Sequence, residues 1–532
     1  PVPMPNTPLY LPAHDWDAVE ALPGEWFWGG GNWRFAKRLV LENKTDDERF
    51  GEPVEVEVDF HVAQITDLSR EVRVVRVLGG GGGEEQPSQV CCEVTEDDTR
   101  RARLFFLADV PARGRVTYLV FYGNPEAPEP AYETDLSVAG EGYALQVENR
   151  HLRAVLAPTN GNLKSLYPKQ GTASFVGSGP PMMGGHGVEG TIHWGPDWSD
   201  ERVGRYRLTN WDGPSRFDYD VARGPVVVRV RRWGHPILSI GPEVGRPHRV
   251  LASVTYTFFA GQPYVLMESK LEVLEETRFR DCRNDEWVIG GDLPEVAWMS
   301  DKGAIGFGAK GWHRQDPLWL TFYDRHTGQG FGSLHLAFEN SHPSWQQPET
   351  VAIQANGIWV RYPVRHATMR SGDFVYERNA YLLHRFEEGG RDAGFGDLMD
   401  HQRRLTKPLI QIEAPPATKP LSVANVTDAL RATNDFELYI QGNPWDPRQL
   451  SVVDLGLVRH VAVDGDDVRL DLVMPYAGRE TWFGWFAARV EEQIRQRLAD
   501  VSAVDVNLVR QPAWSPKQMN ARARRFIGST SD

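Results

Sequence analysis

Strand-like segments separated by turns run through most of the chain, and they constrain its fold more than any other feature. From about residue 24 to 130, apolar residues alternate with polar ones or stand in short runs, and Gly, Pro, Asn and Asp lie between the runs. No segment there keeps a helical period for three turns. The same pattern returns further along, with one helix expected at residues 394–409. The sequence therefore predicts a mainly β chain built from antiparallel sandwiches.

Changes in composition divide the chain into four parts. A proline-rich segment at 1–23 is expected to be an extended arm, and a Pro/Glu-rich linker follows a small β-sandwich domain at 24–130. A large, many-stranded antiparallel sandwich is predicted for 136–412, because a segment of that length with little helix needs many strands. After a second linker, residues 421–532 mix helical and strand patterns and predict a compact α+β domain.

The net charge limits the classes of partner. The chain has 58 basic and 72 acidic residues, a formal charge of -14. Such an acidic surface argues against nucleic acid and against anionic membranes as partners. No run of about 18 apolar residues is present, so no transmembrane helix is predicted. The first residues lack the charged and apolar regions of a secretory signal.

Cysteine is scarce, with only Cys91, Cys92 and Cys282 in the chain. Neighbouring residues of a regular strand point to opposite faces, so Cys91 and Cys92 are not expected to pair with each other. We expect all three thiols to be reduced and structural, and a cytoplasmic location.

Tryptophan and glycine are concentrated in the same segments. Many of the 18 Trp residues lie in or beside turns rich in Gly and Pro, among 51 Gly residues in all. Sugar-binding proteins have this pattern because flat aromatic faces stack on sugar rings. All-β folds with long loops have it as well, so the composition leaves both interpretations open.

The C-terminal part resembles the MIP18/PaaD-like (DUF59) family in a predicted hairpin with an Asp-Gly turn, the helix that follows it, and a later strand and helix. The matching residues are Val452–Pro475 and Asn507–Arg524. The family serves in iron–sulfur cluster assembly and in the maturation of ring-hydroxylating complexes. Its usual T-x-P-G-C-P-like turn has a cysteine, whereas Met474–Trp482 has none, and neither does the rest of 421–532. A thiolate would hold a soft metal or a cluster, so the resemblance here implies a reused scaffold.

An aromatic cluster at 480–486 accompanies this departure from the family pattern. One helix face cannot bury all of its rings, so part of the cluster is expected to meet another domain or subunit. The C-terminal domain would then either close over a site or pair subunits into a homo-oligomer.

The central part is similar to the β-supersandwich of galactose-mutarotase-like domains. The similarity rests on Tyr143–Gly171, which reads as a strand, a Gly-Asn turn and a second strand. Sugar epimerases, several polysaccharide lyases and the C-terminal parts of some glycosidases share this fold. The resemblance implies a carbohydrate-active enzyme with its site on a concave sheet face and in the loops around it.

A loop rich in Gly and Pro carries the first candidate site. His186, Glu189 and His193 are spaced three and four apart, which on a helix would place them on one face. The many glycines argue against a helix, so a site for a divalent metal is only an alternative here. No cofactor is otherwise predicted.

The same loop continues as "EGTIHWGPDWSDE", which favours a role without metal. His193 titrates near neutral pH and could act as a general acid or base. Asp197 would orient it or bind hydroxyl groups, and Trp194 and Trp198 would stack on a sugar. The alternative is a rigid loop with structural Trp residues.

Two further groups of charged residues are candidates. In "FRDCRNDEWVIGGD", Arg283, Asp285 and Glu286 could bind a carboxylate or supply a base, although a surface ion-pair network fits equally. In "HLAFENSHPSW", His335 and Glu339 are expected to point to the same side of a strand, as i and i+4, with Asn340 beside them. Such a pair could abstract a proton from a sugar carbon, whereas a structural polar pair is the alternative. The remaining candidates for substrate binding are Trp211, Tyr362 and Arg365.

Together these features predict a carbohydrate-active enzyme that uses acid/base chemistry, namely elimination, hydrolysis or epimerisation, on a glycoside or a related polyhydroxylated compound. The expected partner is a small-molecule or oligosaccharide substrate. One alternative is a hydrolase or hydro-lyase that acts on a non-sugar small molecule. Another is an accessory or binding protein that docks through its MIP18-like domain.

Overall fold

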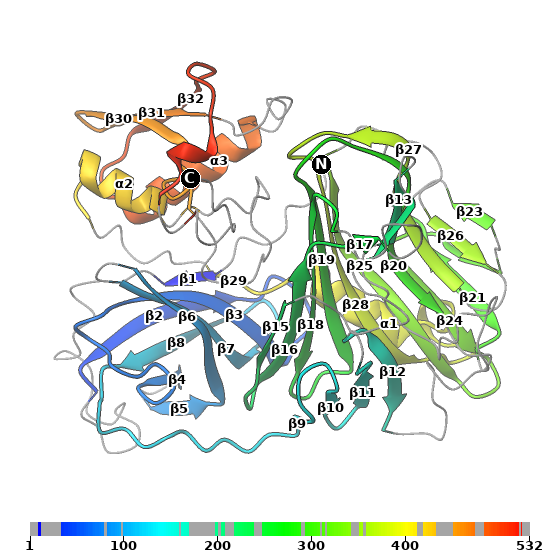
Figure 1. The fold of residues 1–532 in the computed structure, drawn as a ribbon. Helices are drawn as coiled ribbons and strands as arrows, with labels where there is room; N and C mark the ends of the chain where they lie inside the picture. Colours follow the sequence, from blue (N-terminus) through cyan, green and yellow to red (C-terminus); the bar gives the residue numbers. More distant parts are fainter. Residues whose placement is uncertain are drawn as a thin grey trace. The chain divides into compact units, whose positions relative to one another are not determined.

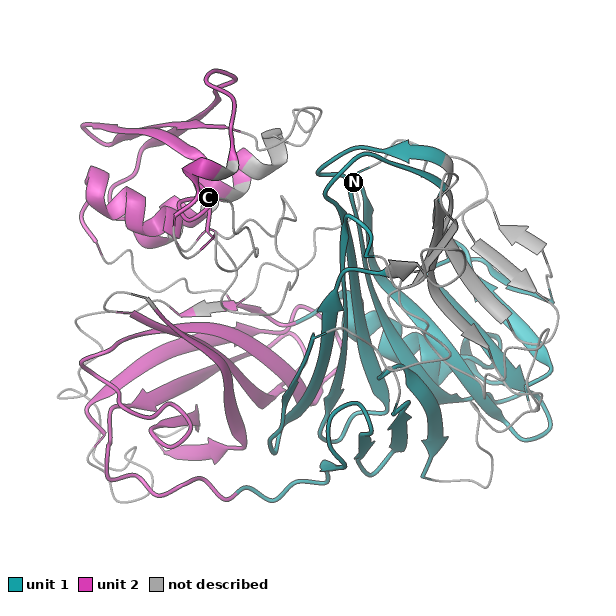
Figure 2. Ribbon diagram, viewed as in Figure 1, with its two compact units in different colours: residues 1–5, 132–408 teal, residues 6–131, 409–532 magenta. Residues whose placement is uncertain are grey.

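The computed structural model describes most of the chain, as two compact units. The units comprise residues 1–5 and 132–408, here called the central unit, and residues 6–131 and 409–532, the flanking unit (Figure 2). Strands make up most of the regular structure, as predicted (Figure 1). The described residues are 9–11, 33–78, 82–96, 99–158, 161–169, 197–200, 204–207, 218–238, 247–288, 293–308, 311–313, 317–341, 351–354, 358–411, 419–431, 433, 451–473, 483–520 and 523.

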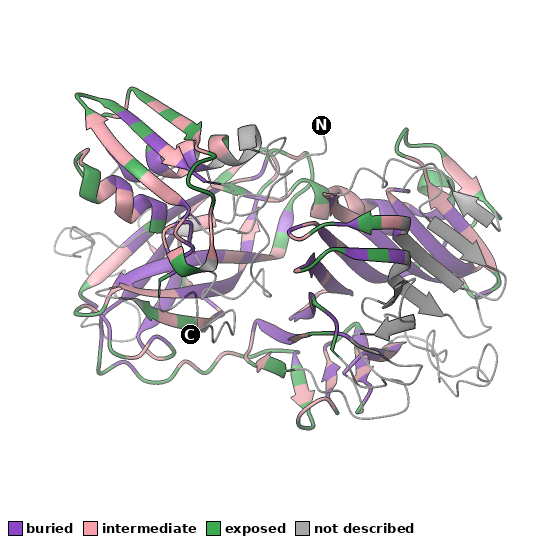
Figure 3. Cartoon of the chain, turned by 45° about the horizontal axis from the view of Figure 1, so that its top comes forward, coloured by how far each residue is buried: buried purple, intermediate pink, exposed green. Residues whose placement is uncertain are grey.

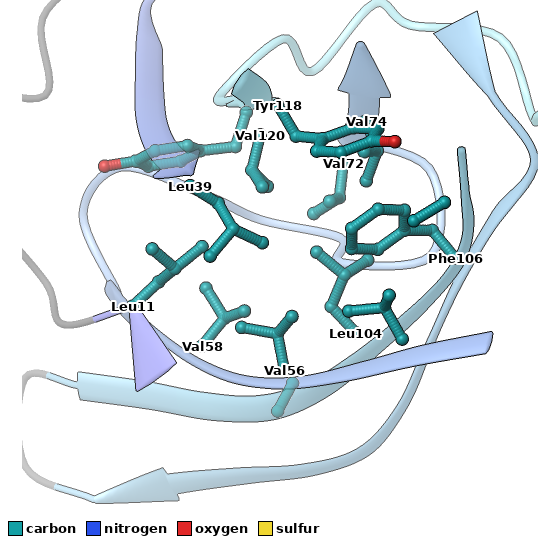
Figure 4. Packing of buried hydrophobic residues seen from close by; sticks show 14 of the residues in the cluster. Leu11, Leu39, Val56, Val58, Val72, Val74, Leu104, Phe106, Tyr118 and Val120 are labelled. Atoms are coloured by element: carbon teal, nitrogen blue, oxygen red, sulfur yellow. The ribbon is translucent and has the colours of Figure 1, made fainter. Parts of the chain in front are cut away.

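The flanking unit contains a β-sandwich of two sheets, with strand orders β1-β3-β7-β6 and β29-β2-β8-β4-β5. Apolar residues at alternate positions of these strands point inward and form one core, in which Val56 and Val58 of one sheet face Leu39 and Val120 of the other (Figure 4). The strands are β1 (Leu9–Leu11), β2 (Phe35–Glu42), β3 (Arg49–His61), β4 (Val72–Val77), β5 (Gly83–Gln86), β6 (Ser88–Glu96), β7 (Thr99–Val110), β8 (Arg115–Tyr122) and β29 (Ile410–Gln411).

The last strand of this sandwich comes from much later in the chain than the others. Strand β29 pairs antiparallel with β2, so that Gln411 lies opposite Leu41. The preceding residue, Leu409, is buried in the sandwich core. The sandwich is therefore completed by residues that follow the whole central unit.

The C-terminal part of the flanking unit follows the predicted order of helix, hairpin, helix and strand. Strands β30 and β31 form the hairpin, and Gly465 takes the left-handed φ of +61° that its tight turn requires. Strand β32 lies parallel to β31. No described helix has the length and apolar character needed to span a membrane. The elements are α2 (Val423–Arg431), β30 (Val458–Asp464), β31 (Asp467–Leu472), α3 (Phe483–Arg497), β32 (Ala503–Leu508) and the short 3₁₀ helix η5 (Pro516–Gln518).

The described residues of the central unit form three antiparallel sheets. Their strand orders are β12-β11-β10-β9, β17-β14-β13-β20-β27-β26-β23 and β15-β16-β18-β19-β28-β25-β24-β21-β22. The first holds the hairpin predicted within 143–171. The elements are β9 (Ser137–Ala139), β10 (Gln146–Glu148), β11 (Leu152–Leu156), β12 (Leu163–Pro168), β13 (Asp197–Asp200), β14 (Gly204–Arg207), β15 (Asp218–Ala222), β16 (Val227–Gly234), β17 (Ile237–Leu238), β18 (Val250–Phe259), β19 (Tyr264–Val273), β20 (Thr277–Val288), β21 (Glu295–Met299), β22 (Ile305–Phe307), β23 (Gly311–His313), β24 (Trp319–Asp324), β25 (Gln329–Asn340), β26 (Val351–Gln354), β27 (Ile358–Met369), β28 (Phe374–Arg385), η3 (Arg391–Gly394) and α1 (Gly396–Thr406).

The two larger sheets of the central unit pack against each other through one face of each. Leu271 and Val375 of the nine-stranded sheet form a core with Phe279 and Val364 of the seven-stranded sheet. We call this side of the nine-stranded sheet its inner face, and the opposite side its outer face. Helix α1, expected from the sequence at 394–409, covers one end of the outer face, where Trp319 Nε1 donates to Met399 Sδ at 3.1 Å. The long middle strands of the nine-stranded sheet are consequently buried over most of their length (Figure 3).

Candidate functional site

Strand β25 contains a β-bulge that decides which residues can form a site. His335 lies opposite Asn379 of β28, and Ala337 lies opposite Arg378, so Leu336 is an extra residue without a partner. Beyond the bulge, Glu339 lies opposite Tyr376. Residues directly opposite each other on antiparallel strands share a face, so the bulge places His335 on the inner face and Glu339 on the outer face.

The prediction that His335 and Glu339 point to the same side is therefore wrong. It assumed an unbroken strand, in which residues four apart share a face. The extra residue reverses the alternation between them. Asn340, the third residue of the group, lies opposite Val375 and is buried on the inner face.

Glu268 is the centre of a polar cluster on the outer face, at the end that α1 leaves uncovered. One of its carboxylate oxygens accepts a hydrogen bond from the Tyr376 hydroxyl at 3.1 Å, and the other accepts one from Arg229 Nη2 at 3.3 Å. Arg378 Nε lies 3.7 Å from the first of these oxygens. We call Arg229, Glu268, Glu339, Tyr376 and Arg378 the outer-face cluster.

The strand register brings these residues together. Glu268 of β19 lies opposite Arg378 of β28, and the next residue on the same face of β28 is Tyr376. Tyr376 in turn lies opposite Glu339 of β25. Three neighbouring strands, β19, β28 and β25, therefore place two carboxylates on either side of one tyrosine (Figure 1).

The side chains of the outer-face cluster differ in how far they are exposed to solvent. The Arg229 side chain is 3% exposed, whereas that of Glu268 is 15% exposed and that of Arg378 is 29% exposed. Tyr376 is buried and Glu339 is half-buried. A molecule that approaches from solvent would meet Arg378 and the two carboxylates first.

The environment of Tyr376 keeps its hydroxyl protonated. Burial raises the pKa of Tyr376 well above its usual value, and the negative charge of Glu268 raises it further. Arg378 opposes this effect, and Glu339 adds to it. The neutral phenol can therefore act as a hydrogen-bond donor to Glu268, which it holds in place as an acceptor.

More charged residues lie on the same face beside the cluster. Lys270 and Glu272 follow Glu268 at alternate positions of β19, and both are buried. Arg231 is buried on β16, and its guanidinium carbon lies 3.8 Å from the centre of the Trp233 ring. Buried charges are costly unless they are paired, so this end of the sheet has a polar lining and not an ordinary apolar core.

The inner face has its own, smaller polar group around His335. Its Nδ1 lies 2.6 Å from the carbonyl oxygen of Pro317, which can only accept, so Nδ1 is the donor of this hydrogen bond. On the neighbouring strand, Asn379 donates from Nδ2 to Glu377 at 2.9 Å, and both residues are fully buried. Glu377 and Asn379 are therefore enclosed, whereas His335 is half-buried, like Glu339 of the outer-face cluster.

Other predicted site residues lie in the seven-stranded sheet. Asp197 of β13 is directly opposite Arg283 of β20, and Asp281 of β20 is opposite Arg365 of β27. The structure thus brings three predicted positions onto three adjacent strands. The positions of Trp198, Glu286 and Tyr362 also belong to these strands.

The metal candidates and part of the sugar-binding set fall on residues that the structure does not describe. These are His186, Glu189, His193, Trp194 and Trp211. Among the residues that are described, no group of three or more His, Cys, Asp or Glu side chains is arranged to hold a metal ion.

The outer-face cluster was missed in the sequence, apart from Glu339. A signal was present in "PYVLMESKLEVL", where Glu268, Lys270 and Glu272 occupy alternate positions of an otherwise apolar strand. The same spacing of polar residues at every second position recurs in "FVYERNAYLLHRF", with Tyr376 and Arg378. Charged residues at every second position of an apolar strand all lie on one face of the sheet. This spacing therefore indicates a polar cluster such as the outer-face cluster.

Comparison with known proteins identifies one part of the chain. Residues 445–507 match the family model described as iron-sulfur cluster assembly protein. The match confirms the predicted resemblance of the C-terminal part to the DUF59 family. A solved DUF59 domain from Bacillus anthracis is 22% identical and aligns with 20% of this chain and 92% of its own, with a TM-score of 0.17. No curated protein matches the sequence.

Two further solved structures align with larger shares of the chain. A glycosyl hydrolase family 38 protein from Enterococcus faecalis is 11% identical and aligns with 70% of this chain and 47% of its own, with a TM-score of 0.43. A galactose 1-epimerase from Lactobacillus acidophilus is 8% identical and aligns with 48% of this chain and 99% of its own, with a TM-score of 0.26. The alignment thus spans less than half the length of the family 38 protein.

Proposed function

We propose that the chain is a carbohydrate-active enzyme whose central unit carries out acid/base chemistry at the outer-face cluster. The observation that supports this most is the arrangement of Glu268 and Glu339 on either side of the buried, neutral Tyr376. A pair of carboxylates with different surroundings is what proton transfer to and from a sugar requires. Arginine and tryptophan near the cluster suit a polyhydroxylated or uronate-containing ligand.

Each residue of the cluster would have a distinct role. Glu268, held by Arg229 and Tyr376, would accept a proton from the substrate as the general base. Glu339 would supply a proton to the substrate as the general acid, from the other side of the sugar ring. Arg378, the most exposed cation of the cluster, would bind a hydroxyl or carboxylate group of the substrate. These roles fit elimination, hydrolysis or epimerisation, and a non-sugar hydroxy acid is the alternative substrate.

The proposal also covers the cofactor, the location, the partners and the oligomeric state of the enzyme. We expect no cofactor for chemistry at the outer-face cluster, with a divalent metal at His186, Glu189 and His193 as the alternative. We also expect a cytoplasmic protein that binds neither nucleic acid nor membranes, and a homo-oligomer formed through the C-terminal domain.

A panel of substrates tests the proposed activity on the full chain. Aryl glycosides, free aldoses and uronate-containing oligosaccharides would be followed by release of the aryl group, by optical rotation and by the ultraviolet absorbance of an unsaturated product. The wild type is expected to turn over or bind at least one class. The Glu268→Gln and Glu339→Gln variants should lose turnover by about 100-fold or more, as expected for loss of a general acid or base.

A matched variant separates chemistry from stability. Glu275→Gln removes a carboxylate of the same unit that is 61% exposed and pairs with Arg249 at the surface. It should keep wild-type turnover. If no compound of the panel is bound or turned over, or if Glu268→Gln keeps wild-type turnover while folded, the proposal is wrong.

A second function is favoured by the match at residues 445–507. In this alternative, the chain is an accessory protein that docks through its C-terminal domain on a partner with an iron–sulfur cluster. Pull-down with the full chain, compared with a chain that ends at residue 420, distinguishes the two. A partner retained only by the full chain, together with no activity on the panel, would favour the accessory role.

A further inference from the structure

Cys91 and Cys92 bring their sulfur atoms together, against expectation. Their Sγ atoms are 3.3 Å apart, with Cys92 donating to Cys91. Both are free thiols, as predicted, but their side chains do not point to opposite faces as those of neighbouring residues in a regular strand do. The two residues therefore form a pair of adjacent thiols, which we call the dithiol.

A local distortion of strand β6 explains the close approach. The register between β6 and β7 shifts between Cys91 and Val94, which marks a β-bulge. Cys92 has a φ of +58°, in the left-handed region that residues with a side chain seldom occupy. This backbone turns the Cys92 side chain toward that of Cys91. Unusual backbone conformations of this kind are concentrated at functional sites.

The dithiol is accessible and lies next to a cation. Both cysteines are half-buried, and β6 is an edge strand of its sheet. Arg103 of β7 lies opposite Cys91. Burial lowers the pKa of Arg103, but Glu55, Glu57 and Cys92 raise it and outweigh burial. A charged guanidinium therefore lies next to the dithiol.

We propose that Cys91 and Cys92 form a redox-active modification site, which small disulfides such as glutathione disulfide convert reversibly into a disulfide between the two neighbouring residues. One thiolate attacks the reagent, RSSR, which forms a mixed disulfide and releases one RS⁻. The second cysteine then attacks the protein sulfur of the mixed disulfide, forms the Cys91–Cys92 bond and releases the second RS⁻. The two protein thiols lose two electrons, RSSR gains them, and the two protons end on two RSH molecules.

The geometry suits a reversible reaction. A disulfide needs its sulfurs at about 2.05 Å, so the two Sγ atoms must approach by only about 1.2 Å. The α-carbons of adjacent residues are about 3.8 Å apart, which is closer than in ordinary disulfides. The closed form is therefore strained, and strained, accessible disulfides are readily reduced again.

Mass spectrometry of the full chain after treatment with glutathione disulfide tests the proposal. In the wild type, the tryptic peptide of residues 77–100 should lose the mass of two hydrogen atoms, and dithiothreitol should restore it. In the Cys92→Ser and Cys91→Ser variants, the same peptide should instead gain one glutathione, because no second thiol resolves the mixed disulfide. Cys282→Ser is the matched control and should behave as the wild type.

A trivalent arsenical, which binds two thiols at once, gives an independent measurement. Phenylarsine oxide should bind the wild type and Cys282→Ser in one equivalent and resist removal by a monothiol, whereas both single variants of the dithiol should lose it. Accumulation of the glutathione adduct on 77–100 in the wild type, to the level of the variants, would overturn the proposal. So would the absence of any change in that peptide.

Discussion

His335 and Glu339 are four residues apart on one strand, yet their side chains lie on opposite faces of the nine-stranded sheet. One unpaired residue, Leu336, causes this separation. Glu339 thereby joins Tyr376 and Glu268 on the outer face, while His335 lies on the inner face. A bulge of this kind can re-aim a side chain without a change in the residue itself.

The first prediction concerns the titration of Tyr376. Because Glu268 and Glu339 both raise its pKa, Glu268→Gln should lower the pKa of Tyr376, and Glu339→Gln should lower it to a smaller extent. His335→Gln should leave it unchanged, since His335 lies on the other face. Alkaline titration followed by NMR of ring-labelled tyrosine, assigned with Tyr376→Phe, measures this. An equal response to His335→Gln and Glu339→Gln would contradict the assignment of faces.

The second prediction concerns the stability that Arg229 contributes. Arg229→Met removes a 3% exposed partner of Glu268 and should lower the free energy of unfolding by about 3 kcal/mol. The matched change Arg249→Met breaks a pair whose side chains are 69% and 61% exposed, so it should cost about 1 kcal/mol or less. Urea denaturation of both variants tests this, and equal losses would argue against a buried cluster.

The third prediction concerns acid sensitivity at helix α1. Burial lowers the pKa of His401 to about 4, from a usual value near 6.5, and the nearby Asp397 opposes burial. The unfolded chain therefore takes up a proton below pH 6.5 that the folded chain does not. The stability from neutral His401 is complete above pH 6.5 and is lost as the pH falls toward 4.

Replacement of His401 should flatten this dependence. Between pH 7 and 5, the wild type should lose about 2 kcal/mol more of its free energy of unfolding than His401→Gln does. The exposed His326, changed to Gln, is the matched control and should follow the wild type. Urea denaturation at the two pH values decides this, and parallel losses in all three proteins would refute it.

The fourth prediction concerns Asp454 in the C-terminal part. Its carboxylate accepts hydrogen bonds from Ser451 N at 2.9 Å, from Ser451 Oγ at 2.8 Å and from Asn520 Nδ2 at 2.6 Å. Asp454→Ala leaves these donors without their acceptor and should cost about 3 kcal/mol of local stability. Asp464→Ala, at the exposed hairpin turn, should cost about 0.5 kcal/mol or less. Hydrogen exchange of residues 451–473 reports both effects, and equal protection in the two variants would be the contrary result.

Features that depend on local patterns could be predicted from the sequence. Alternation of apolar residues predicted the sandwiches, and the Asp464-Gly465 dipeptide predicted the tight turn between β30 and β31. The helix near residue 400 was likewise predicted from its own segment. Each of these signals lies within a dozen or so neighbouring residues.

Features that depend on one extra residue or on a distant strand could not be predicted in the same way. Nothing in "SLHLAFEN" marks Leu336 as the bulged residue, because the bulge is set by pairing with β28. The contact between Cys91 and Cys92 likewise depends on the pairing of β6 with β7. Glu268 and Tyr376 are 108 residues apart in the chain, and only the sheet register joins them.

Strand β29 also determines when the sandwich can be completed during synthesis. The ribosome must translate residues 132–408 between the last early strand of the sandwich and Leu409, the residue that completes its core. At roughly 5–20 residues per second, this takes about 14 to 55 s. During that interval, no other described strand of the sandwich pairs with the edge of β2 that β29 later occupies, and such an edge can pair with other chains. The nascent protein is therefore most vulnerable to aggregation while its middle is being made, and a chaperone that shields this edge would act in that interval.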